Sequence, residues 1–125
     1  FRVGGFLKYY PMYAKGLTEL PLGGWFILLE FLYLLYFIGW EFYFRALLLF
    51  PLEKQLGGLT PLVGVLPFAI MHLGKPVPEV FGSVLAAWFL GVLVLRTRSF
   101  WICPLLHFLI AFAMDLAAAL GRGLV

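Results

Sequence analysis

Residues 80–95, VFGSVLAAWFLGVLVL, contain no Asp, Glu, Lys or Arg. Two other stretches, residues 55–74 and 99–114, are also free of these four residue types. Over all 125 residues, hydrophobic residues make up 64% and charged residues 12%, about half of the charged share that is typical of soluble domains. A water-soluble fold of this size has too little interior to bury so much apolar surface. The sequence therefore predicts an all-α protein, a polytopic transmembrane helical bundle surrounded by the lipid bilayer.

The charge and cysteine content exclude several other classes. Nine Lys and Arg against six Asp and Glu give a net charge of +3. Because the basic residues are scattered, nucleic acid is not an expected partner. The single cysteine, Cys103, excludes an internal disulfide and is expected to be an inert buried thiol. The chain starts with Phe1 rather than Met, so we expect it to be the core of a longer protein.

The N-terminal part differs in composition from the rest. Residues 1–20 mix Gly, Tyr and Lys, which is typical of an interfacial lead-in, and residues 21–125 form the predicted transmembrane core. Within that core, residues 21–54 are almost continuously apolar and exceed the ~20 residues that cross a bilayer. They predict either one long tilted helix or two segments with a break near Gly39.

Three better-bounded helices are predicted after this region. The first begins with Thr60 as its cap and runs to about Leu73. The second opens at residues 78–79 and ends at residues 96–98. The third is capped by Ser99 and ends near Gly121. The whole bundle is therefore predicted to contain four or five membrane segments.

The apolar segments contain a few ionisable side chains, which are costly in a bilayer and are therefore candidates for function; they are Glu30, Glu41, Arg45, His72, His107 and Asp115. Glu41 and Arg45 are four residues apart, so they lie on one face of a helix and can pair. Two interpretations are open. The pair neutralises two buried charges, or Arg45 holds Glu41 ionised and oriented for proton chemistry.

Glu41 and His72 are expected at the same depth in the membrane. The midpoint between positions 41 and 72 falls at residues 56–57, where the chain must turn. In an antiparallel hairpin the two side chains would then face each other. A carboxylate facing an imidazole inside an apolar bundle can bind and polarise one water molecule.

His107 fits this arrangement less simply. Counted from the turn before its helix, it lies ~14 Å deep, whereas His72 is expected ~25 Å from that side. A kink at Pro104 would have to swing His107 toward the bundle centre. Asp115 matches His72 better in depth, although a carboxylate near a helix end is also placed to face solvent or Arg122.

The two remaining acids have simpler interpretations. Glu30 lies near the other end of a predicted span, where a position at the lipid interface is expected. Glu79 follows Pro78 in the first turn of a helix, where the helix dipole stabilises an acid.

Three sequence motifs resemble those of one family. They are WEFYFRA at residues 40–46, FAIMH at residues 68–72, and His107 late in a proline-containing helix. This set resembles the CPBP family of intramembrane proteases, which includes the CAAX prenyl endopeptidases and the bacterial Abi-type bacteriocin-processing proteins. The family pattern is EExxxR, FxxxH and HxxxN (or D) on successive membrane helices, and the resemblance covers roughly residues 25–120. The WEFxFR form is similar to that of a bacterial branch.

The resemblance implies a function and a site. It implies a multi-pass enzyme of the bacterial plasma membrane that hydrolyses a peptide bond of a membrane-associated protein or peptide substrate. Its catalytic residues would be Glu41 and His72, which activate water, His107, which stabilises the oxyanion, and Arg45.

Two positions depart from the family pattern. Trp40 occupies the position of the first Glu, the usual catalytic carboxylate, so Glu41 would take over its role. Ala111 stands four residues after His107, where the family has Asn or Asp, so that oxyanion donor is absent or is supplied elsewhere.

Metal dependence and two other functions stay open at this point. One carboxylate and two histidines could bind zinc, but the HExxH spacing of zinc peptidases is absent, so we favour a glutamate mechanism with no cofactor. A catalytically silent relative that acts as an immunity or scaffold protein is the first alternative. A haem-binding electron carrier with His72 and His107 as axial ligands is the second.

Overall fold

The computed structural model describes Tyr10 and residues 25–123, and the regular elements in this part are all helical. In chain order they are α2 (Trp25–Glu41), the π-helical turn η2 (Phe42–Leu47), α3 (Leu49–Leu56), the short 3₁₀ turn η3 (Gly57–Leu59), α4 (Thr60–Ile70), α5 (Val77–Thr97) and α6 (Ile102–Arg122). The predicted interfacial lead-in at residues 1–20, apart from Tyr10, lies outside the described residues, and so do residues 21–24. The all-α prediction is confirmed.

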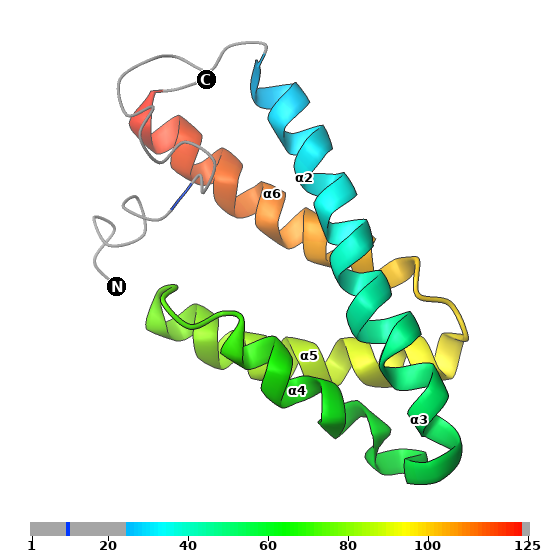
Figure 1. Cartoon of the computed structure of the whole chain (residues 1–125). Helices are drawn as coiled ribbons and strands as arrows, with labels where there is room; N and C mark the ends of the chain where they lie inside the picture. Colours follow the sequence, from blue (N-terminus) through cyan, green and yellow to red (C-terminus); the bar gives the residue numbers. More distant parts are fainter. Residues whose placement is uncertain (1–9, 11–24, 124–125) are drawn as a thin grey trace.

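The helices form two pairs. Helix α2 packs against α6, and α4 packs along α5. The two pairs meet near α3 and diverge from there, as Figure 1 shows with α2 and α6 in cyan and orange and α4 and α5 in green and yellow. The chain passes from one pair to the other through η2, which contacts α2 and α4, and α3, which contacts α4.

Three helical segments of the described chain are long and apolar enough to cross a membrane. They are Trp25–Ile70, Val77–Thr97 and Ile102–Arg122. The first has 46 residues, and it reverses direction at η3, so that α4 returns beside α3 (Figure 1). Large apolar side chains such as Ile27, Phe81 and Leu85 are more than two-thirds exposed, as expected for helices whose outer faces meet lipid. The protein is therefore a multi-pass membrane protein.

Of the two alternatives left open for residues 21–54, a break at Gly39 is not found, because α2 continues to Glu41 and the irregular turn follows it. The helix boundaries differ from the prediction in two places around α4. Helix α4 ends at Ile70 rather than Leu73, since the chain turns at Gly74, whose φ is +92°. Thr60 is the first residue of α4 rather than its cap, and its hydroxyl donates a hydrogen bond back to the Gly57 carbonyl.

The start of α6 is the third difference. The residue before its first turn is Trp101 rather than Ser99. Pro104 is the third residue of the helix, where a backbone N–H would have no partner within the helix in any case. Pro104 therefore removes no helical hydrogen bond, and the predicted kink at this proline is wrong.

A close contact between α4 and α5 brings the two helices together near the site. Gly91 on α5 lies against Pro61 on α4, and a Cβ built on Gly91 would be 3.1 Å from the Pro61 Cβ. Leu49 of α3 packs into the same place and is fully buried. This contact fixes how α4 lies on α5, and α4 in turn carries Phe68 toward the site.

Candidate functional site

The site begins at the π-helical turn that follows α2. Such turns insert an extra residue into a helix and are frequent at functional sites. Here the turn starts directly after Glu41 and contains Arg45. Both side chains are fully buried, and Arg45 Nε donates a hydrogen bond to Glu41 Oε2 at 2.7 Å. The predicted Glu41–Arg45 pair is therefore confirmed.

Arg45 also holds neighbouring helices. Its Nη1 donates to the carbonyl oxygen of Ala87 on α5 at 3.1 Å. The guanidinium carbon lies 5.0 Å from the centre of the Phe68 ring on α4. Arg45 thus connects the π-helical turn to α4 and α5.

The second oxygen of Glu41 binds His107. The distance from His107 Nδ1 to Glu41 Oε1 is 2.6 Å. The expected direct partner, His72, instead has its Nδ1 2.8 Å from the carbonyl oxygen of Phe68 in its own chain segment. Glu41 and His72 are therefore not directly hydrogen-bonded, because depth along a helix does not give the lateral position of a side chain. That the two hold one water molecule between them stays a prediction. Helix α6 packs against α2, and this packing brings His107 to Glu41 without a kink.

These partners fix which ring nitrogen carries a proton. A carbonyl oxygen only accepts, so the Nδ1 of His72 is the donor. A carboxylate paired with Arg45 also only accepts, so His107 donates from Nδ1 as well. In both rings Nε2 is therefore the nitrogen left for another partner. The ring centres are 6.3 Å apart and the planes are inclined by 22°, so the two imidazoles lie side by side and nearly parallel.

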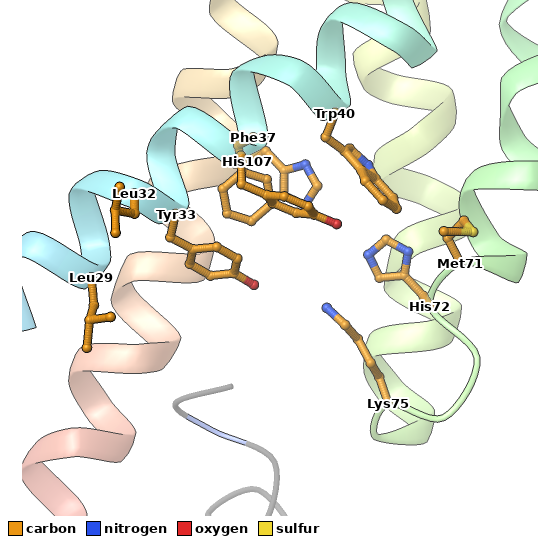
Figure 2. A pocket seen from close by; sticks show the side chains of 10 residues that line it. Leu29, Leu32, Tyr33, Phe37, Trp40, Met71, His72, Lys75 and His107 are labelled. Atoms are coloured by element: carbon orange, nitrogen blue, oxygen red, sulfur yellow. The ribbon is translucent and has the colours of Figure 1, made fainter. Parts of the chain in front are cut away.

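Both histidines line two neighbouring cavities. One has a volume of about 410 Å³ and the other about 600 Å³. The residues that line both are Tyr33, Phe37, His72, Lys75 and His107. Figure 2 shows several of these side chains pointing into the smaller cavity, with the His72 and Lys75 side chains on one side and Tyr33 on the other.

Glu41 and Arg45 line neither cavity. A molecule in the cavities therefore meets the two imidazoles, and it meets the carboxylate only through His107. The four predicted catalytic residues do form one cluster, in which Arg45 binds Glu41, Glu41 binds His107, and His107 lies beside His72.

The two positions that depart from the family pattern are also at this site. Trp40 lines the smaller cavity, and its ring centre is 5.1 Å from that of Phe44 and 6.3 Å from that of Phe68. Ala111 lines the larger cavity. Trp40 and Ala111 therefore stand at the site where the family pattern has its first Glu and its Asn or Asp.

The other ionisable candidates lie away from the cavities. Glu30 is buried, with an exposed fraction of 4%, so the expectation that it lies at the lipid interface is wrong. Asp115 is fully buried and does not face solvent. Neither residue lines either cavity. Cys103 is fully buried, with its Sγ 3.6 Å from the Leu90 carbonyl oxygen, which confirms its assignment as a buried thiol.

The sequence interpretation missed a polar cluster at the edge of the larger cavity. Glu79 begins α5 as predicted, but its carboxylate binds Lys75 Nζ at 2.7 Å and accepts a hydrogen bond from the Tyr10 hydroxyl at 2.5 Å. All three residues line this cavity. The position of Lys75 three residues after His72, next to a glycine, was the signal that could have identified it.

A zinc site does not fit the residues that are present. Within the described part of the chain, no group of three or more His, Cys, Asp or Glu side chains could hold a metal ion. Both oxygens of Glu41 are already bound, by Arg45 and by His107, which leaves only two imidazoles. The residues present therefore do not fit a catalytic metal ion.

The fold and the site define a class: a polytopic membrane protein with a buried Arg–Glu–His chain beside a second histidine at a largely apolar cavity. Residues 22–113, which are well over half of the chain, match the family model described as type II CAAX prenyl endopeptidase Rce1-like, and the chain belongs to this family. Neither the curated proteins nor the solved structures gave a match. Family membership implies a CAAX-type intramembrane protease, which confirms the resemblance to the CPBP family.

Proposed function

We propose that this chain is an intramembrane endopeptidase of the bacterial plasma membrane that hydrolyses a peptide bond in a membrane-associated protein, such as a prenylated CAAX substrate. The family assignment supports the kind of reaction. The observation that carries the proposal is the pair of imidazoles at the cavities, each with its Nδ1 already bound and its Nε2 left for a reactant.

In the proposed reaction His72 is the general base. Water attacks the carbonyl carbon of the scissile bond while His72 Nε2 takes one of its protons. The protonated His72 then gives this proton to the nitrogen of the leaving group, and the C–N bond breaks. The attacking oxygen keeps the second water proton, so one new carboxylic acid and one new amine result, and protons and electrons balance.

His107 is the proposed donor to the oxyanion. In its protonated form, Nδ1–H is bound to Glu41 and Nε2–H is available to the developing negative charge. The Glu41 carboxylate is the counter-ion of this imidazolium. Glu41 and Arg45 are thus positioning residues, which explains how the site dispenses with the carboxylate that Trp40 replaces.

The experiment that tests this function uses purified chain in detergent, a synthetic prenylated CAAX peptide, and ¹⁸O-labelled water. We expect one peptide bond to be cleaved and one ¹⁸O atom to appear in the new carboxylate, measured by mass spectrometry. His72→Ala removes the base and should abolish cleavage, whereas Lys54→Gln, an exposed residue that lines neither cavity, should cleave at the wild-type rate.

Other results would contradict the proposal. If the wild-type chain binds the peptide and leaves it intact, the silent relative that acts as an immunity or scaffold protein becomes the better account. If His72→Ala cleaves as fast as wild type, His72 is not the base.

A further inference from the structure

Lys75 is the only lysine or arginine among the described residues that line the two cavities. We propose that Lys75 is an anion-binding residue of the substrate site and that it receives the C-terminal carboxylate of the peptide on the leaving side of the cleaved bond. This inference rests on the proposed function, since it assigns a role within the same cavities.

The backbone fixes Lys75 next to His72. The Lys75 N–H donates a hydrogen bond to the His72 carbonyl oxygen at 3.2 Å, which closes a tight turn. In such a turn the first and last Cα atoms lie within about 7 Å of each other. Gly74 makes the turn possible with its φ of +92°, a conformation that L side chains rarely adopt. The backbone therefore places the cation and the proposed base on neighbouring positions of one turn, and both side chains line the same two cavities.

The Lys75 ammonium has N–H donors that its ion pair with Glu79 does not use. An ammonium carries three N–H donors, and Lys75 uses one of them to bind Glu79 Oε1. The other Glu79 oxygen accepts from the Tyr10 hydroxyl, so Glu79 is held in place by a second partner. Burial raises the pKa of the Tyr10 phenol, and its hydrogen bond to Glu79 raises it further, so Tyr10 stays a donor. Glu79 thus orients the cation and leaves its remaining donors for a ligand.

The direction of the Lys75 side chain fits a ligand in the cavity. Figure 2 shows its ammonium pointing into the cavity rather than away from it, with the phenol oxygen of Tyr33 on the opposite side. The rest of the lining is mainly aliphatic and aromatic, with side chains such as Leu29 and Phe37. In such surroundings a cation attracts an anion more strongly than it does in water. A carboxylate at the end of an apolar peptide matches this arrangement of one cation in an apolar cavity.

The same chemistry would suit the phosphate of a lipid headgroup. The turn that places Lys75 next to His72 favours the peptide, because a carboxylate bound there belongs to the same molecule as the bond that is hydrolysed beside His72. A lipid headgroup at this position would occupy the space of the leaving peptide and would act as an inhibitor instead.

The experiment compares two synthetic prenylated CAAX peptides, one with a free C-terminal carboxylate and one with a C-terminal amide. Binding is measured by fluorescence anisotropy in detergent, and cleavage is measured separately. We expect the wild-type chain to bind the acid about tenfold more tightly than the amide, the effect of one charge-assisted hydrogen bond. In Lys75→Gln this preference should disappear, with the loss expressed in KM rather than kcat. Lys75→Arg should retain most of it.

Two further variants separate recognition from a structural role. Glu79→Gln removes the ion pair but keeps the cation, so the preference for the acid should persist. Lys54→Gln, at an exposed lysine that lines neither cavity, should leave it unchanged. If Lys75→Gln weakens the binding of both peptides equally, Lys75 only supports the fold and the inference is wrong.

The lipid alternative and the proposed function have their own readouts. The binding measurement is repeated in nanodiscs of phosphatidylcholine with and without phosphatidylglycerol. Abolition of the acid preference by the anionic lipid would assign Lys75 to a headgroup and overturn the inference. Cleavage of both peptides with the same KM would leave the proposed function intact and exclude the role of Lys75. A preference for the acid in binding, without cleavage of either peptide, would support anion binding by Lys75 and contradict the proposed function.

Discussion

Glu41 is the residue on which the site depends, because each of its two oxygens holds a different helix. Oε2 accepts from Arg45 in the turn after α2, and Oε1 accepts from His107 on α6. Arg45 extends the chain of contacts to the Ala87 carbonyl on α5. A fully buried ion pair of this kind stabilises little as a pair, but it is strongly destabilising when one member is removed.

Removing Arg45 alone should therefore be worse than removing the pair. We expect Arg45→Ala to lower the free energy of unfolding by about 3–5 kcal/mol, because it leaves the Glu41 charge buried with one partner fewer. The double variant Glu41→Ala/Arg45→Ala should lose less than the sum of the two single variants. Thermal unfolding in detergent measures all three, and strictly additive losses would show that the two charges do not interact.

His72 provides a prediction about pH. It lies in the turn between two membrane-spanning helices, and burial lowers its pKa below the ordinary value of 6.5. The neutral base is populated above this pKa, and protonation at lower pH removes it. Cleavage of a CAAX peptide should thus be constant near pH 7 and fall only at a pH below 6.5. A rate that already halves above pH 7 would assign the base to another group.

At the scale of the elements, two helical glycines have different roles, one in the packing of two helices and one with no packing role. Gly91 lies where α5 contacts α4, and an added Cβ would lie 3.3 Å from the Pro61 Cα as well as 3.1 Å from its Cβ. Gly39 lies within α2 and has nothing within 4 Å of a built Cβ. Gly91 is required because two helices approach closely there, whereas Gly39 is only a poor helix former.

The two substitutions should accordingly have opposite effects. Gly91→Val should lower the free energy of unfolding by about 1–3 kcal/mol through overpacking, and it should slow cleavage because α4 carries the turn that holds His72. Gly39→Ala should be neutral or stabilise by up to about 1 kcal/mol. A destabilising Gly39→Ala would indicate that α2 is broken at this glycine, as one interpretation of the sequence held.

At the scale of the whole molecule, composition and charge-free stretches are enough to predict the all-α membrane architecture, because apolar surface of this extent has no place in water. The cost of burying a charge in a bilayer selects six candidates, and the resemblance of the motifs to the family reduces them to Glu41, Arg45, His72 and His107. Their pairing could not be predicted, since it depends on how α6 packs laterally against α2. The π-helical turn left no recognisable pattern in the sequence either. The family assignment agrees with the motifs, while the Glu41–His107 contact is visible only in three dimensions.

The central claim is that Glu41 acts through His107, and a double-mutant cycle on cleavage tests it most directly. His107→Ala removes the proposed oxyanion donor and should reduce kcat about 10²–10³-fold. Glu41→Gln keeps the shape of the side chain but removes the negative charge that faces His107 Nδ1, and it should also reduce kcat. If Glu41 acts only through His107, adding Glu41→Gln to His107→Ala should cause little further loss, as is found for groups that act as a unit. Losses that multiply in the double variant would show that Glu41 acts on the reaction independently, and they would contradict the account.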